Sequence, residues 1–168
     1  MVTSLRWKTQ IVLILFLLAA CAPATAEPTP VSISTFNDPD KELTKAVRQA
    51  QDTLYILRQA FLAPKPSYVF MSVKVRFATE NGIEDMWTEP IDILNNTYTV
   101  RMVEGVTLEL KAHPDRYVEV APEEIIDWMI LEDDGTVLGG YTLRLEYARL
   151  TPEEQEKYRE RTGYLRFE

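Results

Sequence analysis

The sequence predicts an α+β domain, in which a long N-terminal helix packs on a curved antiparallel sheet of six to seven short strands and a short C-terminal helix closes the chain. Three observations carry this prediction. Apolar residues recur at helical spacing over residues 43–61, the spacing changes to two from residue 69, and a capped helical pattern returns after residue 151. A chain of 168 residues is long enough to bury a substantial core in one domain.

The first 20 residues have the pattern of a secretory signal and are excluded from this fold. Arg6 and Lys8 precede an unbroken apolar run over residues 11–18, which is too short to cross a bilayer as a mature helix. Residues 18–21, Leu-Ala-Ala-Cys, resemble the lipobox of bacterial lipoproteins. The resemblance implies cleavage before Cys21 and lipidation of Cys21 by several acyl chains, palmitate among them. The alternative is an ordinary signal peptide that is cut near a stray cysteine.

Residues 21–36 are rich in proline, alanine and threonine and predict a semi-extended tether, which leaves residues 37–168 as the globular domain. Cleavage removes Arg6 and Lys8 and changes the formal charge from −8 to −10. An acidic domain is a poor partner for nucleic acid or anionic lipid. We therefore expect an exported protein, anchored in the membrane through Cys21 and facing the periplasm or the cell exterior, whose partner is an unknown envelope protein or polymer.

The first helix is predicted to begin with Asp38 as its N-cap and Pro39 as its first residue. It would present one apolar stripe to the sheet and end before Pro64. The stripe consists of Leu43, Val47, Ala50, Leu54, Leu57 and Phe61.

The middle of the chain predicts short strands joined by turns. Asn81-Gly82 and Asn95-Asn96 are signals for hairpin turns, and Pro90 indicates the end of a strand or a sheet edge. A further turn is expected around His113-Pro114. The predicted strands cover residues 69–77, 83–88, 91–94, 98–103, 108–110 and 117–120.

The stretch 125–145 predicts a hairpin followed by one more strand. Residues 128–131 and 136–139 flank a turn in which Asp134 and Gly135 would both take positive φ angles, and Gly139-Gly140 marks a bulge or a close backbone approach. Beyond it, apolar and polar residues alternate over 141–146, which favours a half-buried strand. A single helical turn is expected at 122–126, and the last helix should run from the cap Thr151 to about residue 161.

Several short motifs are similar to those of the YegJ-like bacterial family, a domain of unknown function. The resemblance covers residues 38–158 and implies a small secreted or lipid-anchored domain without an assigned reaction. The motifs are Ser-Val-Lys-Val-Arg-Phe at 72–77, Met-Trp at 86–87, Asp-Arg-Tyr-Val at 115–118, Ile-Asp-Trp-Met at 126–129 and Gly-Gly-Tyr-Thr-Leu-Arg at 139–144.

The sequence contains no recognisable catalytic constellation. His113 is the only histidine, no Gly-x-Ser-x-Gly motif occurs, and acylation would consume the only thiol, Cys21. No spaced ligand set for zinc is present, and the turn 132–135 lacks the anchoring acids of a calcium loop. We therefore expect no metal and no cofactor.

The leading hypothesis is a non-enzymatic binding or interaction module of the cell envelope. Its candidate surface comprises Trp87, Asp127, Trp128, Tyr141 and Arg144. A hydrolase of envelope polymers that uses Asp127 with Arg144 or Glu146 is the second hypothesis, and a protective or inhibitory protein that masks a target is the third. Against all three, Trp128 and Tyr141 could be packing residues and Asp127 a backbone cap. A buried Asp127 bonded to backbone donors would indicate a scaffold, whereas an open carboxylate beside another titratable group would indicate a site.

Overall fold

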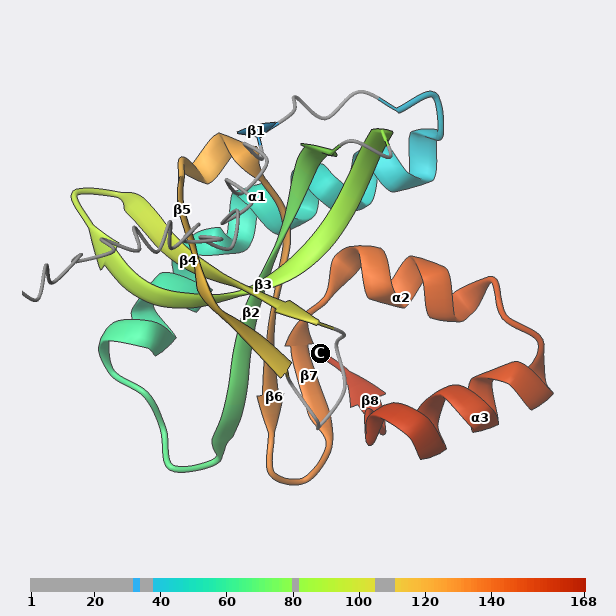
Figure 1. Ribbon diagram of the computed structural model, residues 1–168. Helices are drawn as coiled ribbons and strands as arrows, with labels where there is room; N and C mark the ends of the chain where they lie inside the picture. Colours follow the sequence, from blue (N-terminus) through green and yellow to red (C-terminus); the bar gives the residue numbers. More distant parts are fainter. Residues whose placement is uncertain (1–31, 34–37, 80–81, 105–110) are drawn as a thin grey trace, which may run out of the picture. The chain divides into compact units, whose positions relative to one another are not determined.

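The computed structural model describes residues 32–33, 38–79, 82–104 and 111–168, all within one compact unit, Val31–Glu168. The predicted signal, Cys21, Asn81 and the strand 108–110 lie outside the described residues. The fold is α+β, as predicted (Figure 1). Its helices are α1 (Lys41–Leu62), α2 (Tyr141–Ala148) and α3 (Pro152–Thr162), with a 3-10 turn η1 (Pro122–Glu124).

One sheet contains all the described strands, in the order β5-β4-β3-β2-β6-β7-β8, with β1 also pairing with β2. Every pair is antiparallel except β7–β8, so the sheet is mixed rather than purely antiparallel. The strands are β1 (Ser32–Ile33), β2 (Tyr68–Thr79), β3 (Gly82–Leu94), β4 (Thr97–Glu104), β5 (Lys111–Val120), β6 (Ile125–Glu132), β7 (Thr136–Gly139) and β8 (Arg166–Phe167).

Helix α1 covers one face of the sheet and buries the middle of the predicted apolar stripe, whereas Leu43 and Phe61 at its two ends are half-buried. Ala50, Leu54 and Leu57 pack against inward-facing side chains of β2, β4 and β6. Its N-cap is Asp40 rather than Asp38, because Asp40 Oδ1 accepts the amide hydrogens of Glu42 and Leu43. Asp38 instead accepts from the amide of Asp40 and turns the chain into the helix.

The opposite face of β2 and β6 carries a second, smaller core beneath α2, α3 and β8. It consists of Trp87, Met129, Leu131, Val137, Leu143 and Tyr164. The hairpin that forms β6 and β7 is present as predicted, with Met129 opposite Gly139 and Leu131 opposite Val137. In its turn Gly135 has a positive φ but Asp134 does not, so the predicted pair of left-handed residues is wrong. Asp134 instead accepts from the amide and hydroxyl of Thr136.

Three other predicted boundaries differ from the structure. Residues 83–88 and 91–94 belong to one strand, β3, in which a register shift next to Pro90 replaces the predicted break. The turn expected around His113-Pro114 lies inside β5, where pairing with β4 jumps from Tyr117 to Ala112. Ser32 and Ile33, predicted as tether, form β1.

The predicted strand over 141–146 is the helix α2, which is the main error in the predicted fold. Gly139 and Gly140, both with positive φ, reverse the chain at its start. Gly139 also makes the close approach that the sequence predicted, because a Cβ there would lie 2.5 Å from the carbonyl oxygen of Trp128. The C-terminal helix α3 has the predicted Thr151–Glu154 capping box and ends at Gly163.

Candidate functional site

Asp127 is fully buried and its carboxylate forms the N-terminal cap of α2. Gly140, the N-cap residue, has no side chain to accept the first amide hydrogens of the helix. Asp127 reaches over from β6 and takes that role. Its Oδ1 accepts from the amides of Trp128 (2.8 Å) and Tyr141 (3.0 Å), and its Oδ2 accepts from the amide (2.7 Å) and hydroxyl (2.6 Å) of Thr142.

Four donors from three residues surround the Asp127 carboxylate, which suits the ionised form. Burial raises the pKa of Asp127, and the hydrogen bonds from Thr142, Trp128 and Tyr141 oppose that rise. A negative charge at the start of α2 also matches the positive end of the helix dipole. Asp127 therefore behaves as a structural carboxylate that joins the strand β6 to the helix α2.

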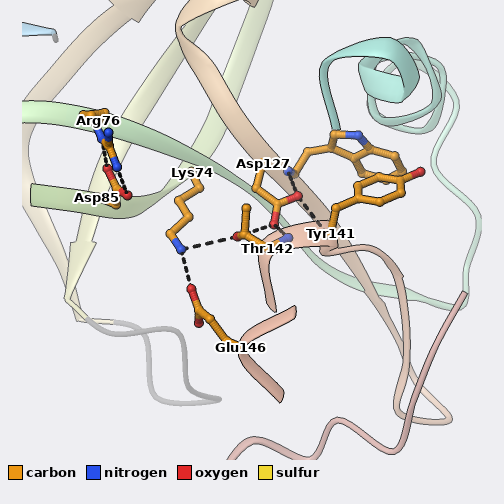
Figure 2. A network of polar contacts seen from close by, with 8 residues as sticks. Lys74, Arg76, Asp85, Asp127, Tyr141, Thr142 and Glu146 are labelled. Atoms are coloured by element: carbon orange, nitrogen blue, oxygen red, sulfur yellow. Dashed lines mark hydrogen bonds and ion pairs between the residues drawn. The ribbon is translucent and has the colours of Figure 1, made fainter. Parts of the chain in front are cut away.

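A chain of polar contacts continues from Asp127 to the surface (Figure 2). The Nζ of Lys74 donates to Thr142 Oγ1 (3.3 Å) and to Glu146 Oε1 (2.9 Å). Lys74 is 8% exposed and lies opposite both Asp127 on β6 and Trp87 on β3. Its ammonium group stands 5.6 Å from the centre of the Trp87 ring. The buried lysine thus holds Glu146 in place at the protein surface.

Trp128 faces the other way, into the core under α1. It is 1% exposed, and its indole Nε1 donates to the carbonyl of Ala50 (3.0 Å) and to Thr53 Oγ1 (3.2 Å). Tyr141 contacts it edge-on with ring centres 6.2 Å apart. These contacts are those of a packing residue whose polar atom is satisfied.

Arg144 also has a structural position in α2. Its guanidinium lies 5.0 Å from the Tyr141 ring, Nε donates to the carbonyl of Gly139 (2.8 Å), and a terminal nitrogen donates to the carbonyl of Glu168. The five residues of the predicted surface thus occupy three places. Asp127 and Trp87 lie on one sheet face, Trp128 lies on the other, and Tyr141 and Arg144 lie at the start of α2.

A cleft of about 430 Å³ opens between α2 and α3, next to the surface end of the polar chain. We call it the α2–α3 cleft. Tyr147 and Tyr158 contact each other edge-on at 5.7 Å within it, and burial, followed by the charge of Glu146, raises the pKa of Tyr158 to about 12. Its lining residues are Glu146, Tyr147, Leu150, Glu154, Lys157, Tyr158 and Arg161.

The cleft carries charges of both signs. Lys74 holds one oxygen of Glu146, and the other charged groups lie on α3. Glu154 accepts from Thr151 as the helix cap, and Lys157 pairs with Glu153. The guanidinium of Arg161 lies 5.6 Å from the Tyr158 ring and forms no ion pair with any described residue. The cleft therefore offers an aromatic wall, an acidic group and a cation, Arg161, that has no ion-pair partner among the described residues.

Sequence reasoning missed Lys74, Thr142 and the α2–α3 cleft. Lys74 alternates with apolar neighbours on β2, a pattern typical of a solvent-facing strand position, but in the fold it contacts α2 and Trp87 and is buried. The cleft could be predicted only together with α2, because two of its seven lining residues, Glu146 and Tyr147, lie on that helix.

Within the described part of the chain, no cluster of three or more His, Cys, Asp or Glu side chains could hold a metal ion. Nor do the described helices include one with the length and hydropathy to span a bilayer. The family described as "Uncharacterized protein conserved in bacteria (DUF2314)" matches residues 40–166, so the chain belongs to that family and the expectation of a bacterial domain of unknown function is confirmed. No curated protein matches the chain. No solved structure matches it either.

Proposed function

We propose that this chain, which belongs to the bacterial DUF2314 family, is a binding module that a lipid anchor holds at the cell envelope. In this proposal the acylated Cys21 is the anchor and residues 21–36 link it to the domain. We also propose that the domain is similar to YegJ-like proteins, as its short motifs suggest. In this proposal the ligand binds in the α2–α3 cleft. The module carries out no reaction of its own.

The single observation that carries the binding role is the combination of groups in the α2–α3 cleft. Two tyrosine rings, an acidic group fixed by a buried lysine and an arginine without an ion-pair partner among the described residues converge on one open cavity of about 430 Å³. Cavities of this size, with an apolar wall and a few fixed polar groups, are typical of ligand sites. The Asp127 carboxylate, by contrast, is closed to a substrate because four donors surround it.

The chemistry of the cleft favours a ligand that carries a ring and charges of both signs. Tyr147 and Tyr158 offer ring edges and faces to a sugar, Arg161 and Lys157 offer donors to carboxylates, and Glu146 accepts from an ammonium group. A saccharide–peptide polymer of the bacterial envelope has all three kinds of group. Peptidoglycan is therefore the ligand that we propose.

Calorimetric titration of a peptidoglycan disaccharide–pentapeptide into the full chain tests the binding role. Because hydrogen bonds to charged groups contribute about 1.5–3 kcal/mol, Arg161→Ala should weaken binding by about tenfold or more. Arg48→Ala removes the same charge from the exposed side of α1 and is the matched control. No measurable heat, or an equal loss in both variants, would remove the cleft from the proposal.

The anchor requires a separate test. Cells that express the chain are labelled with a fatty-acid analogue, and Cys21→Ser should abolish the label and leave an unprocessed or released protein. Equal labelling of the parent and of Cys21→Ser would exclude the lipoprotein while leaving the binding role open.

A further inference from the structure

The sheet splits along β2. Pairing with β3 covers Val73 to Thr79, whereas residues 68–72 of β2 pair only with β6 among the described strands. Among the described strands, β3 pairs only with β4 beyond Thr88, and it curves away from β2 in Figure 1. Residues 68–72 of β2, about 16 Å of strand at roughly 3.3 Å per residue, thus lack a second neighbouring strand among the described residues, although the amide of Tyr68 already donates to the carbonyl of Lys65.

Hydroxyl side chains fix the point where the two strands separate. Ser72 Oγ donates to the carbonyl of Thr88 (2.7 Å), and Thr88 Oγ1 donates to the carbonyl of Val73 (3.0 Å). Both hydroxyl residues are completely buried. Since these hydroxyls bond to the carbonyls of the last paired residues, Val73 and Thr88, the split is a built feature of the sheet and not a frayed end.

The part of β3 around Pro90 cannot pair with residues 68–72 of β2. Pro90 has no amide hydrogen, and the register shift that follows it directs β3 toward β4. A cleft of about 290 Å³ remains between the strands, which we call the β2–β3 cleft. Phe61, Pro64, Val69, Met71 and Pro90 give it an apolar lining.

The charge of the β2–β3 cleft is already neutralised. Among the described residues that line it, Glu89 is the one with a charge, and Arg101 donates two hydrogen bonds to that carboxylate. Val69 lies at a register shift of β2 and is 57% exposed at the opening. The cleft therefore complements an uncharged occupant that brings backbone donors and acceptors of its own.

We propose that the β2–β3 cleft accepts an extended, uncharged segment of a partner protein, about five residues long, which adds to the edge of β2 as an extra strand. Strand addition satisfies the unpaired backbone groups of β2, which neither a lipid chain nor a sugar does in register. Alternate side chains of the segment would contact the Phe61 side and the Phe70 side of the sheet. This site is separate from the α2–α3 cleft and does not depend on it.

A displayed library of random dodecapeptides, selected on the full chain, supplies the probe. The best peptide is then synthesised unmodified and in two N-methylated forms. One form carries the methyl groups on the odd-numbered amides and the other on the even-numbered amides. Strand addition predicts that one methylated form loses binding at least tenfold while the other keeps it, because only every second amide faces β2. Hydrogen exchange should show new protection of the amides within residues 69–72.

Two variants complete the test. Val69→Asp places a charge at the opening and should weaken the unmodified peptide at least tenfold, whereas Ile83→Asp, a β-branched residue with 58% exposure on β3, should not. The proposal is overturned if no peptide is selected, if both methylated forms bind alike, or if protection appears between α2 and α3 instead. Protection that depends on protein concentration without peptide would show that a second copy of the chain is the occupant, and would also overturn it.

Discussion

Replacing Asp127 by asparagine tests the scaffold interpretation at its most connected residue. The substitution nearly preserves the shape of the side chain but turns one of two acceptor oxygens into a donor. If the amide nitrogen replaces Oδ1, the amides of Trp128 and Tyr141 lose their acceptor. If it replaces Oδ2, the amide of Thr142 loses its acceptor. Either orientation leaves a buried donor unpaired.

The expected loss follows from these contacts. One buried amide without an acceptor costs about 1–3 kcal/mol, and the loss of a negative charge at the start of α2 adds about 0.3–1 kcal/mol. We therefore expect Asp127→Asn to lower the free energy of unfolding by about 1–4 kcal/mol. For a domain of this size the melting temperature should fall by on the order of 10 °C.

Urea unfolding followed by circular dichroism measures the effect. Asp52→Asn removes the same charge from an exposed position on α1 and should change the unfolding free energy by less than about 0.5 kcal/mol. An Asp127→Asn protein as stable as the parent would refute the capping role and return Asp127 to the list of candidate site residues.

Three further predictions concern the surrounding scaffold. Trp128→Ala should lower the unfolding free energy by roughly 3–5 kcal/mol, since it empties a buried position between α1 and the sheet, and unchanged urea unfolding would contradict the packing role. Gly139→Ala should cost more than about 2 kcal/mol, because φ is +73° and the new Cβ would lie 2.5 Å from a carbonyl oxygen; Gly82→Ala, with φ +116° but open space around it, is the control and should cost less. Hydrogen bonds from Thr136, together with Arg166, hold the pKa of Asp134 below its ordinary value of 3.8. The stabilisation by the ionised Asp134 is therefore present above pH 3.8 and disappears as the pH falls through the lower folded-state pKa. Asp134→Asn should lower the melting temperature at pH 7 but not in strong acid. The control Asp133→Asn should lower it at neither pH.

The sequence correctly predicted those elements that are determined by residues close to one another in the chain. The apolar stripe of α1, the hairpin turn at Asn95-Asn96 and the Thr151–Glu154 capping box each follow from residues that are close in the sequence. All three are present, and both asparagines of the turn have positive φ angles. The close approach at Gly139 was also predictable, since glycine pairs in a strand indicate contact with backbone.

Helix α2 could not be predicted in this way, because its cap comes from another part of the chain. Residues 141–146 alternate between apolar and polar side chains, which favours a strand. The helix forms because Asp127, 14 residues earlier, accepts the amide hydrogens of Tyr141 and Thr142. The register shift next to Pro90 is similar, since it depends on where β4 pairs.

The candidate site was hidden for the same reason. Trp87 on β3 and Asp127 on β6 lie on the same sheet face because each pairs with Lys74 on β2. The sequence separates Lys74 from both residues, so local patterns do not show this pairing. The α2–α3 cleft requires two helices of which one was predicted as a strand. Local sequence patterns therefore could not predict a site whose residues are brought together by elements that are distant in the sequence.

The most direct test of the account compares the affinity of the disaccharide–pentapeptide for Asp127→Asn and for Arg161→Ala, each measured at a temperature where both variants remain folded. If Asp127 is scaffold and the α2–α3 cleft is the site, the dissociation constant of Asp127→Asn should stay within about twofold of the parent while that of Arg161→Ala rises about tenfold or more. Normal binding by Arg161→Ala together with lost binding by a folded Asp127→Asn would contradict the account.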